Sequence, residues 1–254
     1  MKKILLLLTL ILMFSPSSFA AEKLKFAAVE KVPPFTIEEG GKVSGMAIEI
    51  FEEVAKRMGF EADIRALPFK RLLHYLKNGT LDGAIQIYYN PEREKFIIYS
   101  EVPGYWQAHY VFIKKGNEDR FPTKTLKDLY GKRVAKERGF FVTQEFQKAV
   151  EEGKIIVDEA QNAELNLSKL LSGRMDCYVS NYHIALYNIR KLGYQGQIVP
   201  LSEPLAPKKG TFMAISKKSK NIPNKEEFMK KFSATLREIH SDGTLERITN
   251  KYVR

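Results

Sequence analysis

The chain has 254 residues, with 41 Lys and Arg against 30 Asp and Glu, and one cysteine, Cys177. A single cysteine excludes an internal disulfide, and the basic residues are dispersed among acidic ones, as in EREK at residues 92–95. This dispersal disfavours a nucleic-acid-binding surface. The length suffices for one large domain or two small ones, each with its own hydrophobic core.

The first twenty residues predict a secretory signal peptide. Lys2 and Lys3 form a positive start, residues 4–14 an apolar run, and residues 18–20 (Ser-Phe-Ala) a cleavage site. The apolar run is too short to span a bilayer. We expect cleavage after Ala20 and export to the periplasm. We expect no lipid anchor, because the residue after the cleavage site is not a cysteine that could accept a lipid. The mature chain keeps 39 basic and 30 acidic residues, a formal charge of +9.

Downstream, short apolar runs alternate with amphipathic segments. The expected strands are residues 24–29, 62–67, 84–87, 107–113, 133–136, 155–157, 177–180 and 212–215. The expected helices are residues 46–58, 71–77, 144–150, 164–171, 182–189, 226–240 and 245–252. This alternation predicts an α/β fold built from open, mostly parallel sheets flanked by helices.

The alternation of strands and helices is interrupted by the long strand candidate at residues 107–113 and then begins again. This interruption indicates two lobes. We assign residues 21–109 and 208–254 to lobe 1 and residues 110–207 to lobe 2, with two crossover segments between them. Ligands of open α/β sheets bind beyond the carboxyl ends of the strands. Two such sheet ends that face each other across crossover segments form a cleft able to close on a ligand.

The stretch DGAIQIYYNPEREKFIIYS, residues 82–100, points most directly to chemistry. An apolar run ends in Tyr88 and Tyr89, Asn90-Pro91 signals a turn, and Arg93 follows. An arginine fork beside aromatic rings suits a small carboxylate with an apolar or cationic body. The alternative is a surface arginine that caps the turn or pairs with a neighbouring glutamate.

Several motifs, in this order, resemble family 3 of the bacterial extracellular solute-binding proteins, the polar amino-acid-binding group that serves ABC transporters. The resemblance covers residues 24–252. The motifs are PPF (33–35), VSGMAIEIFEEVAKRMG (43–59), PFKRLLHYLKNGTLDGAI (68–85), NPER (90–93), YSEVPGYW (99–106), LKDLYGKRVAKERG (126–139), LLSGRMD (170–176) and SDGTLERITNKY (241–252). This resemblance implies the two-lobed type II periplasmic-binding-protein fold.

The resemblance also implies ligand-binding residues in lobe 1. Arg93 takes the position of the arginine that clamps the ligand carboxylate, and backbone from Gln86 to Tyr89 supplies further hydrogen bonds. Phe35 and Phe69 take the aromatic wall positions, although either could instead belong to the core. Arg71, which follows Phe69, is a further candidate, with a solvated helix arginine as its alternative.

In lobe 2 the chain departs from the family pattern twice. Gly139 is followed by Phe140, Phe141 and Val142 instead of small hydroxyl residues. Asn181 stands where amino-acid binders place the aspartate that holds the α-ammonium, and an amide cannot form that ion pair. The expected ligand-binding residues are therefore Phe35, Phe69, Arg71, Gln86, Tyr88, Tyr89, Arg93, Trp106, Phe140, Phe141, Val142 and Asn181.

The leading function is a receptor that binds a small carboxylate-bearing solute, amino acid or amino-acid-like, and delivers it to an ABC permease. The alternatives are a dehydratase-type enzyme on the same fold, with Glu137, His109 or His183 as acid, and a ligand-sensing component. No cofactor or metal is expected, because the four histidines share no metal-ligand spacing. We expect a monomer without a nucleic-acid partner.

Overall fold

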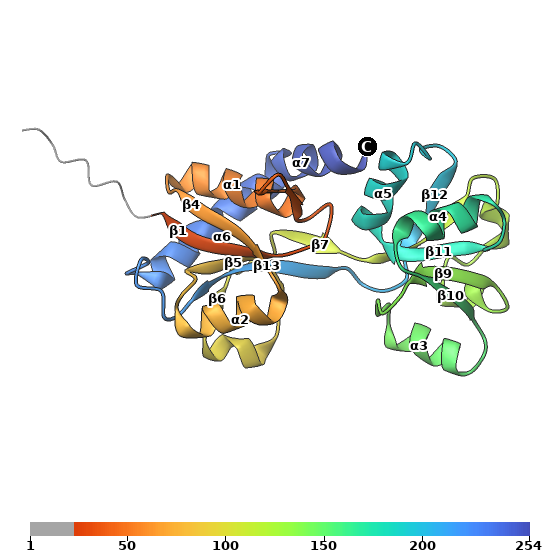
Figure 1. Cartoon of the computed structure of the whole chain (residues 1–254), viewed down its shortest axis with the longest axis horizontal. Coiled ribbons are helices and arrows are strands. Elements are labelled where there is room, and N and C mark those ends of the chain that lie inside the picture. Colours follow the sequence, from red (N-terminus) through yellow and green to blue (C-terminus); the bar gives the residue numbers. More distant parts are fainter. Residues whose placement is uncertain (1–22) are drawn as a thin grey trace, which may run out of the picture.

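The computed structural model describes residues 23–254, so the predicted signal peptide and its cleavage site lie outside the described residues. The described chain forms two lobes joined by extended strands, with the C-terminal helix above the junction (Figure 1). Within residues 23–254, every helix is too short or too polar to traverse a lipid bilayer.

Lobe 1 is built on a six-stranded sheet in the order β4-β1-β5-β13-β6, with β7 also paired to β13. Its strands are β1 (Leu24–Val29), β4 (Ala62–Leu67), β5 (Gly83–Tyr88), β6 (Ile97–Tyr99), β7 (Tyr105–Gln107) and β13 (Lys209–Ser216). The β1–β4 and β1–β5 pairs are parallel, whereas β13 runs antiparallel to each of its partners.

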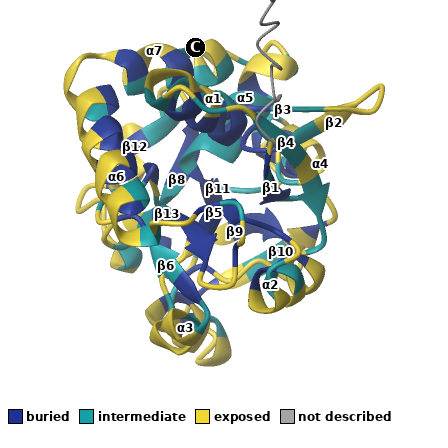
Figure 2. Ribbon diagram, turned by 90° about the vertical axis from the view of Figure 1, so that its left-hand side faces the viewer, coloured by how far each residue is buried: buried dark blue, intermediate teal, exposed yellow. Residues whose placement is uncertain are grey.

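Helices cover both faces of this sheet. They are α1 (Met46–Met58), α2 (Phe69–Asn78), α6 (Lys225–Ser241) and α7 (Thr244–Val253). On one face, Phe51 of α1 packs with Phe26 of β1 and Phe232 of α6, and on the other Leu72 and Leu76 of α2 are fully buried. A short hairpin, β2 (Ile37–Glu39) and β3 (Lys42–Ser44), projects from the body with an exposed tip (Figure 2).

Lobe 2 repeats the plan with a five-stranded sheet in the order β10-β9-β11-β8-β12. Its strands are β8 (His109–Lys114), β9 (Arg133–Glu137), β10 (Ile156–Ala160), β11 (Cys177–Asn181) and β12 (Ile198–Pro204), and its helices are α3 (Gln144–Glu151), α4 (Ala163–Leu171) and α5 (Tyr182–Lys191). Helix α3 covers one face, and α4 and α5 cover the other. The fold class is confirmed, with mixed sheets in place of mostly parallel ones.

The long strand expected at residues 107–113 is wrong as one element, because it breaks at Ala108 into β7 and β8. Strand β7 pairs with β13 in lobe 1, whereas β8 pairs with β11 and β12 in lobe 2. The chain returns to lobe 1 across residues 205–208, between β12 and β13. These two crossovers are the covalent links between the lobes.

Two consecutive residues at the start of β11 have structural roles. Asp176, just before β11, accepts hydrogen bonds from the Arg133 backbone N–H at 2.8 Å and from the Arg120 guanidinium at 2.7 Å. Cys177 is fully buried, and burial raises the pKa of its thiol, which keeps it protonated and unreactive.

Candidate functional site

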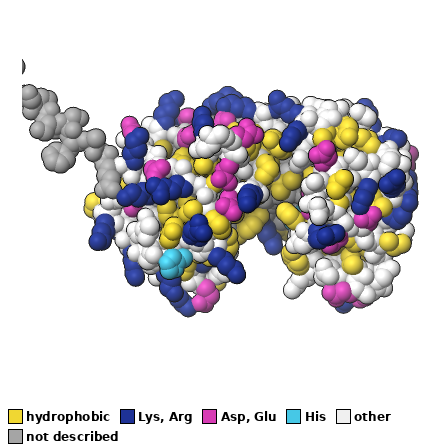
Figure 3. All heavy atoms as spheres, viewed as in Figure 1, with side chains coloured by type: hydrophobic (Ala, Val, Ile, Leu, Met, Phe, Trp, Pro, Cys, Tyr) yellow, Lys and Arg dark blue, Asp and Glu magenta, His cyan; other side chains and the backbone are white. Residues whose placement is uncertain are grey.

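A cavity of about 430 Å³ lies between the lobes, at the hollow visible in the space-filling view (Figure 3). Lobe 1 and the crossover strands supply most of its wall, and lobe 2 closes the other side. The lining residues are Val29, Val32, Phe35, Phe69, Gln86, Ile87, Tyr88, Arg93, Tyr105, Gln107, His109, Phe140, Phe141, Asn181, Ile184 and Thr211. We call this cavity the cleft pocket.

Phe35 is held in the cleft pocket by the start of α1. The Met46 and Ala47 N–H groups donate to the carbonyls of Pro34 and Phe35, at 2.7 and 3.1 Å. This contact requires glycine at position 45, where φ is 123° and a Cβ atom would lie 2.5 Å from the Phe35 oxygen. The ring of Phe35 is buried and therefore also part of the core.

Behind Phe35, a buried amide network fixes the floor of the pocket. Tyr105 stacks on Phe35 with ring centroids 5.0 Å apart and donates its hydroxyl to Gln86 Oε1 at 2.6 Å. Gln86 Nε2 in turn donates to Thr36 Oγ1 at 2.6 Å. Both ends of the Gln86 side chain are thus satisfied inside the protein, so its position is set before any ligand arrives.

Arg93 is placed by the turn that follows β5. The side chain of Asn90 accepts from the Glu92 N–H at 2.9 Å and so caps the short 3₁₀ helix Pro91–Lys95. Arg93 Nη1 donates to the Tyr88 carbonyl at 2.9 Å, and the guanidinium carbon lies 5.0 Å from the centre of the Phe69 ring. No carboxylate of residues 23–254 pairs with Arg93, so most of its five N–H donors remain available to a ligand.

Lobe 2 presents an apolar loop. Phe140 and Phe141 are 50% and 57% exposed, and both line the cleft pocket. The buried Lys136 fixes the loop, because its ammonium donates to the Phe140 carbonyl at 3.0 Å and pairs with Glu159 at 2.5 Å. The loop ends at Thr143, whose hydroxyl caps α3 by accepting from the Phe146 N–H at 3.0 Å. The loop thus has one hydroxyl side chain after the phenylalanines, that of Thr143, and this hydroxyl caps α3.

Asn181 uses both ends of its side chain. Its Oδ1 caps α5 by accepting from the His183 and Ile184 N–H groups at 3.0 and 3.3 Å. Its Nδ2 donates to Gln107 Oε1 at 2.8 Å, and Gln107 Nε2 donates to Thr211 Oγ1 at 3.1 Å. This chain of bonds joins lobe 2 to both crossover strands, and its orientation depends on an amide at position 181.

Among residues 23–254, no aspartate or glutamate lines the cleft pocket. Glu137 is buried instead beside β11, where it accepts from Tyr178 and Ser180, and burial raises the pKa of its carboxyl. Glu164 is exposed on α4. Burial and then the charge of Lys209 lower the pKa of His109, which favours its neutral form. Arg93 is therefore the one fixed charge among the described residues of the lining.

The structure gathers eight of the twelve predicted site residues around the cleft pocket, and four lie elsewhere. Tyr89 and Val142 line an adjoining cavity of about 940 Å³ that shares Tyr88, Phe141 and Asn181 with the first. Trp106 lines another cavity between the lobes, to which Tyr105 also contributes, and does not line the cleft pocket as Tyr105 and Gln107 do. Arg71 lines a separate surface cavity of about 390 Å³ on lobe 1.

Three polar lining residues were missed by sequence reasoning, namely Tyr105, Gln107 and Thr211. Tyr105 and Thr211 are register partners in the β7–β13 pair, so they lie side by side on one face. Period-2 alternation could have placed Tyr105 and Gln107 together, but their pairing with Thr211 depends on a contact about a hundred residues away in sequence. Among residues 23–254, no group of three or more His, Cys, Asp or Glu side chains could hold a metal ion.

Residues 24–254 match the family model for bacterial extracellular solute-binding proteins, family 3. The ABC transporter arginine-binding protein 1 of Escherichia coli is 28% identical over 258 residues, with 99% of each chain covered. The probable amino-acid-binding protein YxeM of Bacillus subtilis is 27% identical over 220 residues, or 86% of this chain and 79% of that one.

In fold, the chain is similar to the unliganded, open L-cystine solute receptor of Neisseria gonorrhoeae. The TM-score is 0.73 at 20% identity, with 91% of this chain and 92% of that one covered.

Proposed function

Because the chain belongs to family 3 of the bacterial extracellular solute-binding proteins, we propose that it captures a small carboxylate-bearing solute in the cleft pocket and delivers it to an ABC permease. The family is one of extracellular solute-binding proteins, which supports a receptor over the alternative of an enzyme. The relatives reported above carry names for amino-acid binding, which supports a ligand with a carboxylate. The proposal concerns the class of the ligand and its onward transport.

Arg93 is the observation that carries the proposal. Its guanidinium stands at the wall of an interlobe cavity, is steadied by the Tyr88 carbonyl and the Phe69 ring, and has no carboxylate partner among the described residues. A planar guanidinium offers two parallel N–H groups to a carboxylate, which an ammonium cannot do. A ligand carboxylate would supply the missing counter-charge.

The remainder of the cleft pocket favours a ligand without a free ammonium. No carboxylate in the part of the chain that the structure describes lines it, and the amide of Asn181 is already engaged by α5 and Gln107. Transfer of an ammonium from water into a closed cleft costs several kcal/mol, about what an ion pair must return. The rings of Phe69, Tyr88, Phe140 and Phe141 suit an apolar or aromatic body instead.

A matched ligand panel tests this proposal. Native mass spectrometry of protein purified without ligand removal would first show whether a solute co-purifies, and its mass. Calorimetry would then compare three acids that share one aromatic body and differ at the α-nitrogen. These are phenylalanine, N-acetylphenylalanine and 3-phenylpropionate. We expect the acids without an ammonium to bind more tightly than the free amino acid.

Two outcomes would contradict parts of the proposal. Strong stabilisation by arginine, lysine, histidine or glutamine, with none by deaminated analogues, would overturn the ligand class. It would indicate that a carboxylate such as Glu145, in the adjoining cavity, reaches the ammonium on closure. Unimpaired uptake of the bound solute in cells that lack this protein would overturn the role in delivery.

A further inference from the structure

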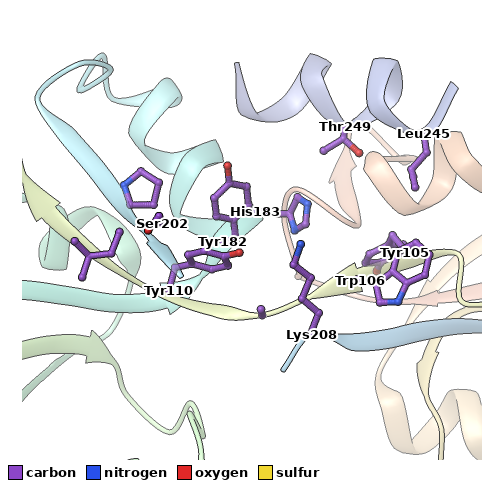
Figure 4. Close-up of a pocket in the computed structure, with 12 residues that line it drawn as sticks. Tyr105, Trp106, Tyr110, Tyr182, His183, Ser202, Lys208, Leu245 and Thr249 are labelled. Atoms are coloured by element: carbon purple, nitrogen blue, oxygen red, sulfur yellow. The ribbon is translucent and has the colours of Figure 1, made fainter. Parts of the chain in front are cut away.

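A second cavity between the lobes, about 420 Å³ in volume, lies on the side of the crossover strands opposite the cleft pocket. We call it the back pocket. In the close-up, helix α7 forms its roof, α5 stands at one side, and the crossover strands pass beneath (Figure 4). The lining residues are Tyr105, Trp106, Ala108, Tyr110, Tyr182, His183, Pro200, Leu201, Ser202, Lys208, Leu245 and Thr249.

The back pocket combines aromatic walls with one positive charge. Four of its lining residues are tyrosine or tryptophan, and Trp106 is 40% exposed. The Lys208 side chain extends toward His183 from the return crossover (Figure 4). Within residues 23–254, no carboxylate lines the cavity and none forms an ion pair with Lys208.

Lys208 is the one ionised side chain among the described residues of this lining, because His183 is neutral. Burial, and then the charge of Lys208, lower the pKa of His183 to about 4, so the imidazole is neutral near pH 7. The hydroxyls of Tyr110, Tyr182, Ser202 and Thr249 add neutral hydrogen-bonding groups around the same space.

We propose that the back pocket is a second binding site, for a small organic anion that carries an aromatic ring, with the carboxylate at Lys208 and the ring among Trp106, Tyr110 and Tyr182. Its two walls belong to different lobes, because Trp106, Leu245 and Thr249 come from lobe 1, whereas Tyr182 and Ser202 come from lobe 2. An occupant that contacts both walls resists rotation of one lobe against the other and so opposes closure of the cleft.

Trp106 is the one tryptophan of the chain, so its fluorescence reports directly on the back pocket. Sodium benzoate is the anionic probe, and benzamide is its neutral match. The decisive variants are Lys208→Gln and Lys209→Gln, because these neighbouring lysines line opposite sides, the back pocket and the cavity next to the cleft pocket. Arg93→Ala removes the charge of the cleft pocket.

We expect benzoate to change the Trp106 emission in a saturable way and to bind more tightly than benzamide. Lys208→Gln should weaken benzoate binding by at least about tenfold, whereas Lys209→Gln and Arg93→Ala should leave it unchanged. Equal affinity for benzamide, no saturable response, or equal losses in both lysine variants would each overturn the proposal. Loss of the response in Arg93→Ala would assign benzoate to the cleft pocket instead, in support of the proposed function alone.

Discussion

The two lobes have the same sheet plan but contribute opposite chemistry to the cleft pocket. In each sheet a central strand pairs in parallel with two neighbours, β1 with β4 and β5, and β9 with β10 and β11. The loops after the lobe 1 strands carry Phe35 and Arg93. In lobe 2, the loop after β9 carries Phe140, and β11 ends at the amide of Asn181.

The lobe 1 half is organised before a ligand arrives, because the side chain of Gln86 is bonded at both ends and Arg93 is anchored to the Tyr88 carbonyl. The lobe 2 half instead leaves two phenyl rings about half exposed. Burial of apolar surface lowers the free energy by about 25 cal/mol per Å². We therefore infer that lobe 1 supplies orientation and charge, while lobe 2 gains by covering the ligand.

Replacement of Arg93 is the strongest test of this difference between the two lobes. A charged pair left half-made in a closed site costs about 2–5 kcal/mol. We therefore expect Arg93→Ala to weaken carboxylate binding in calorimetry by roughly a hundredfold or more, and Arg93→Lys to recover only part of the loss. Arg71→Ala is the matched control, because this arginine of lobe 1 lies at another cavity. Equal effects of the two alanine variants would refute a special role for Arg93.

The pH dependence of stability tests the contact between the lobes. The ring of His183 in lobe 2 lies 5.7 Å from that of Phe35 in lobe 1, and its Nδ1 is buried without a hydrogen-bond partner. Burial, with Lys208, lowers the pKa of His183 from 6.5 to about 4. As the pH falls from 6.5 to about 4, the unfolded chain binds a proton that the folded chain does not, so stability is lost.

The lost stability amounts to about 3 kcal/mol. We expect urea unfolding of the wild type to show this loss across that pH range and His183→Gln to show a flatter profile. His74→Gln, at an exposed histidine, should retain the wild-type slope. Identical slopes for all three proteins would show that His183 does not titrate as its surroundings imply.

Local pattern predicted much of the scaffold. The 3.6-residue spacing of apolar side chains placed α1 at its observed limits, Met46–Met58, between two glycines with positive φ, and Leu24–Val29 was likewise predicted as a strand. The break at Ala108 was not predictable, because a continuous apolar strand pattern does not show that its two halves pair with different sheets.

The site residues likewise divide into those that local sequence pattern predicted and those that depend on contacts distant in sequence. Arg93 was predictable because a local turn signal and a family motif coincide at one place in the sequence. Trp106 was not separable from its neighbours by composition, and only the folded structure places it in the back pocket and outside the cleft pocket. The bond from Asn181 to Gln107 joins positions 74 residues apart, so no local signal indicates it.

The variant Asn181→Asp would sharpen the contrast between the lobes by giving lobe 2 a charge. Aspartate caps helices as well as asparagine does, so α5 should persist. The bond to Gln107 Oε1 loses its donor, and a carboxylate faces the pocket. Since a hydrogen bond to a charged group is worth about 1.5–3 kcal/mol, we expect the preference for free amino acids over deaminated acids to rise at least about tenfold in calorimetry.

Asn162→Asp is the control for that experiment. Asn162 caps α4 in the same manner, with Oδ1 accepting from the Leu165 N–H at 2.9 Å, but it does not line the cleft pocket. The same charge change there should leave ligand preference unaltered. A shift of equal size in both variants would indicate a long-range effect of net charge and would contradict a local role for position 181.

The smallest expected effect concerns the apolar loop of lobe 2. Burial of a whole phenylalanine side chain contributes about 1.5–3 kcal/mol, and Phe141 is already about half covered, so closure can add about 1 kcal/mol. Phe141→Ala should thus weaken binding only about fivefold, without loss of thermal stability, because more than half of the residue is already exposed in this structure. Tyr130→Ala, which removes a 41% exposed ring that lines neither interlobe pocket, should change neither quantity. A loss in Phe141→Ala as large as that in Arg93→Ala would mean that lobe 2 orients the ligand as strongly as lobe 1 does.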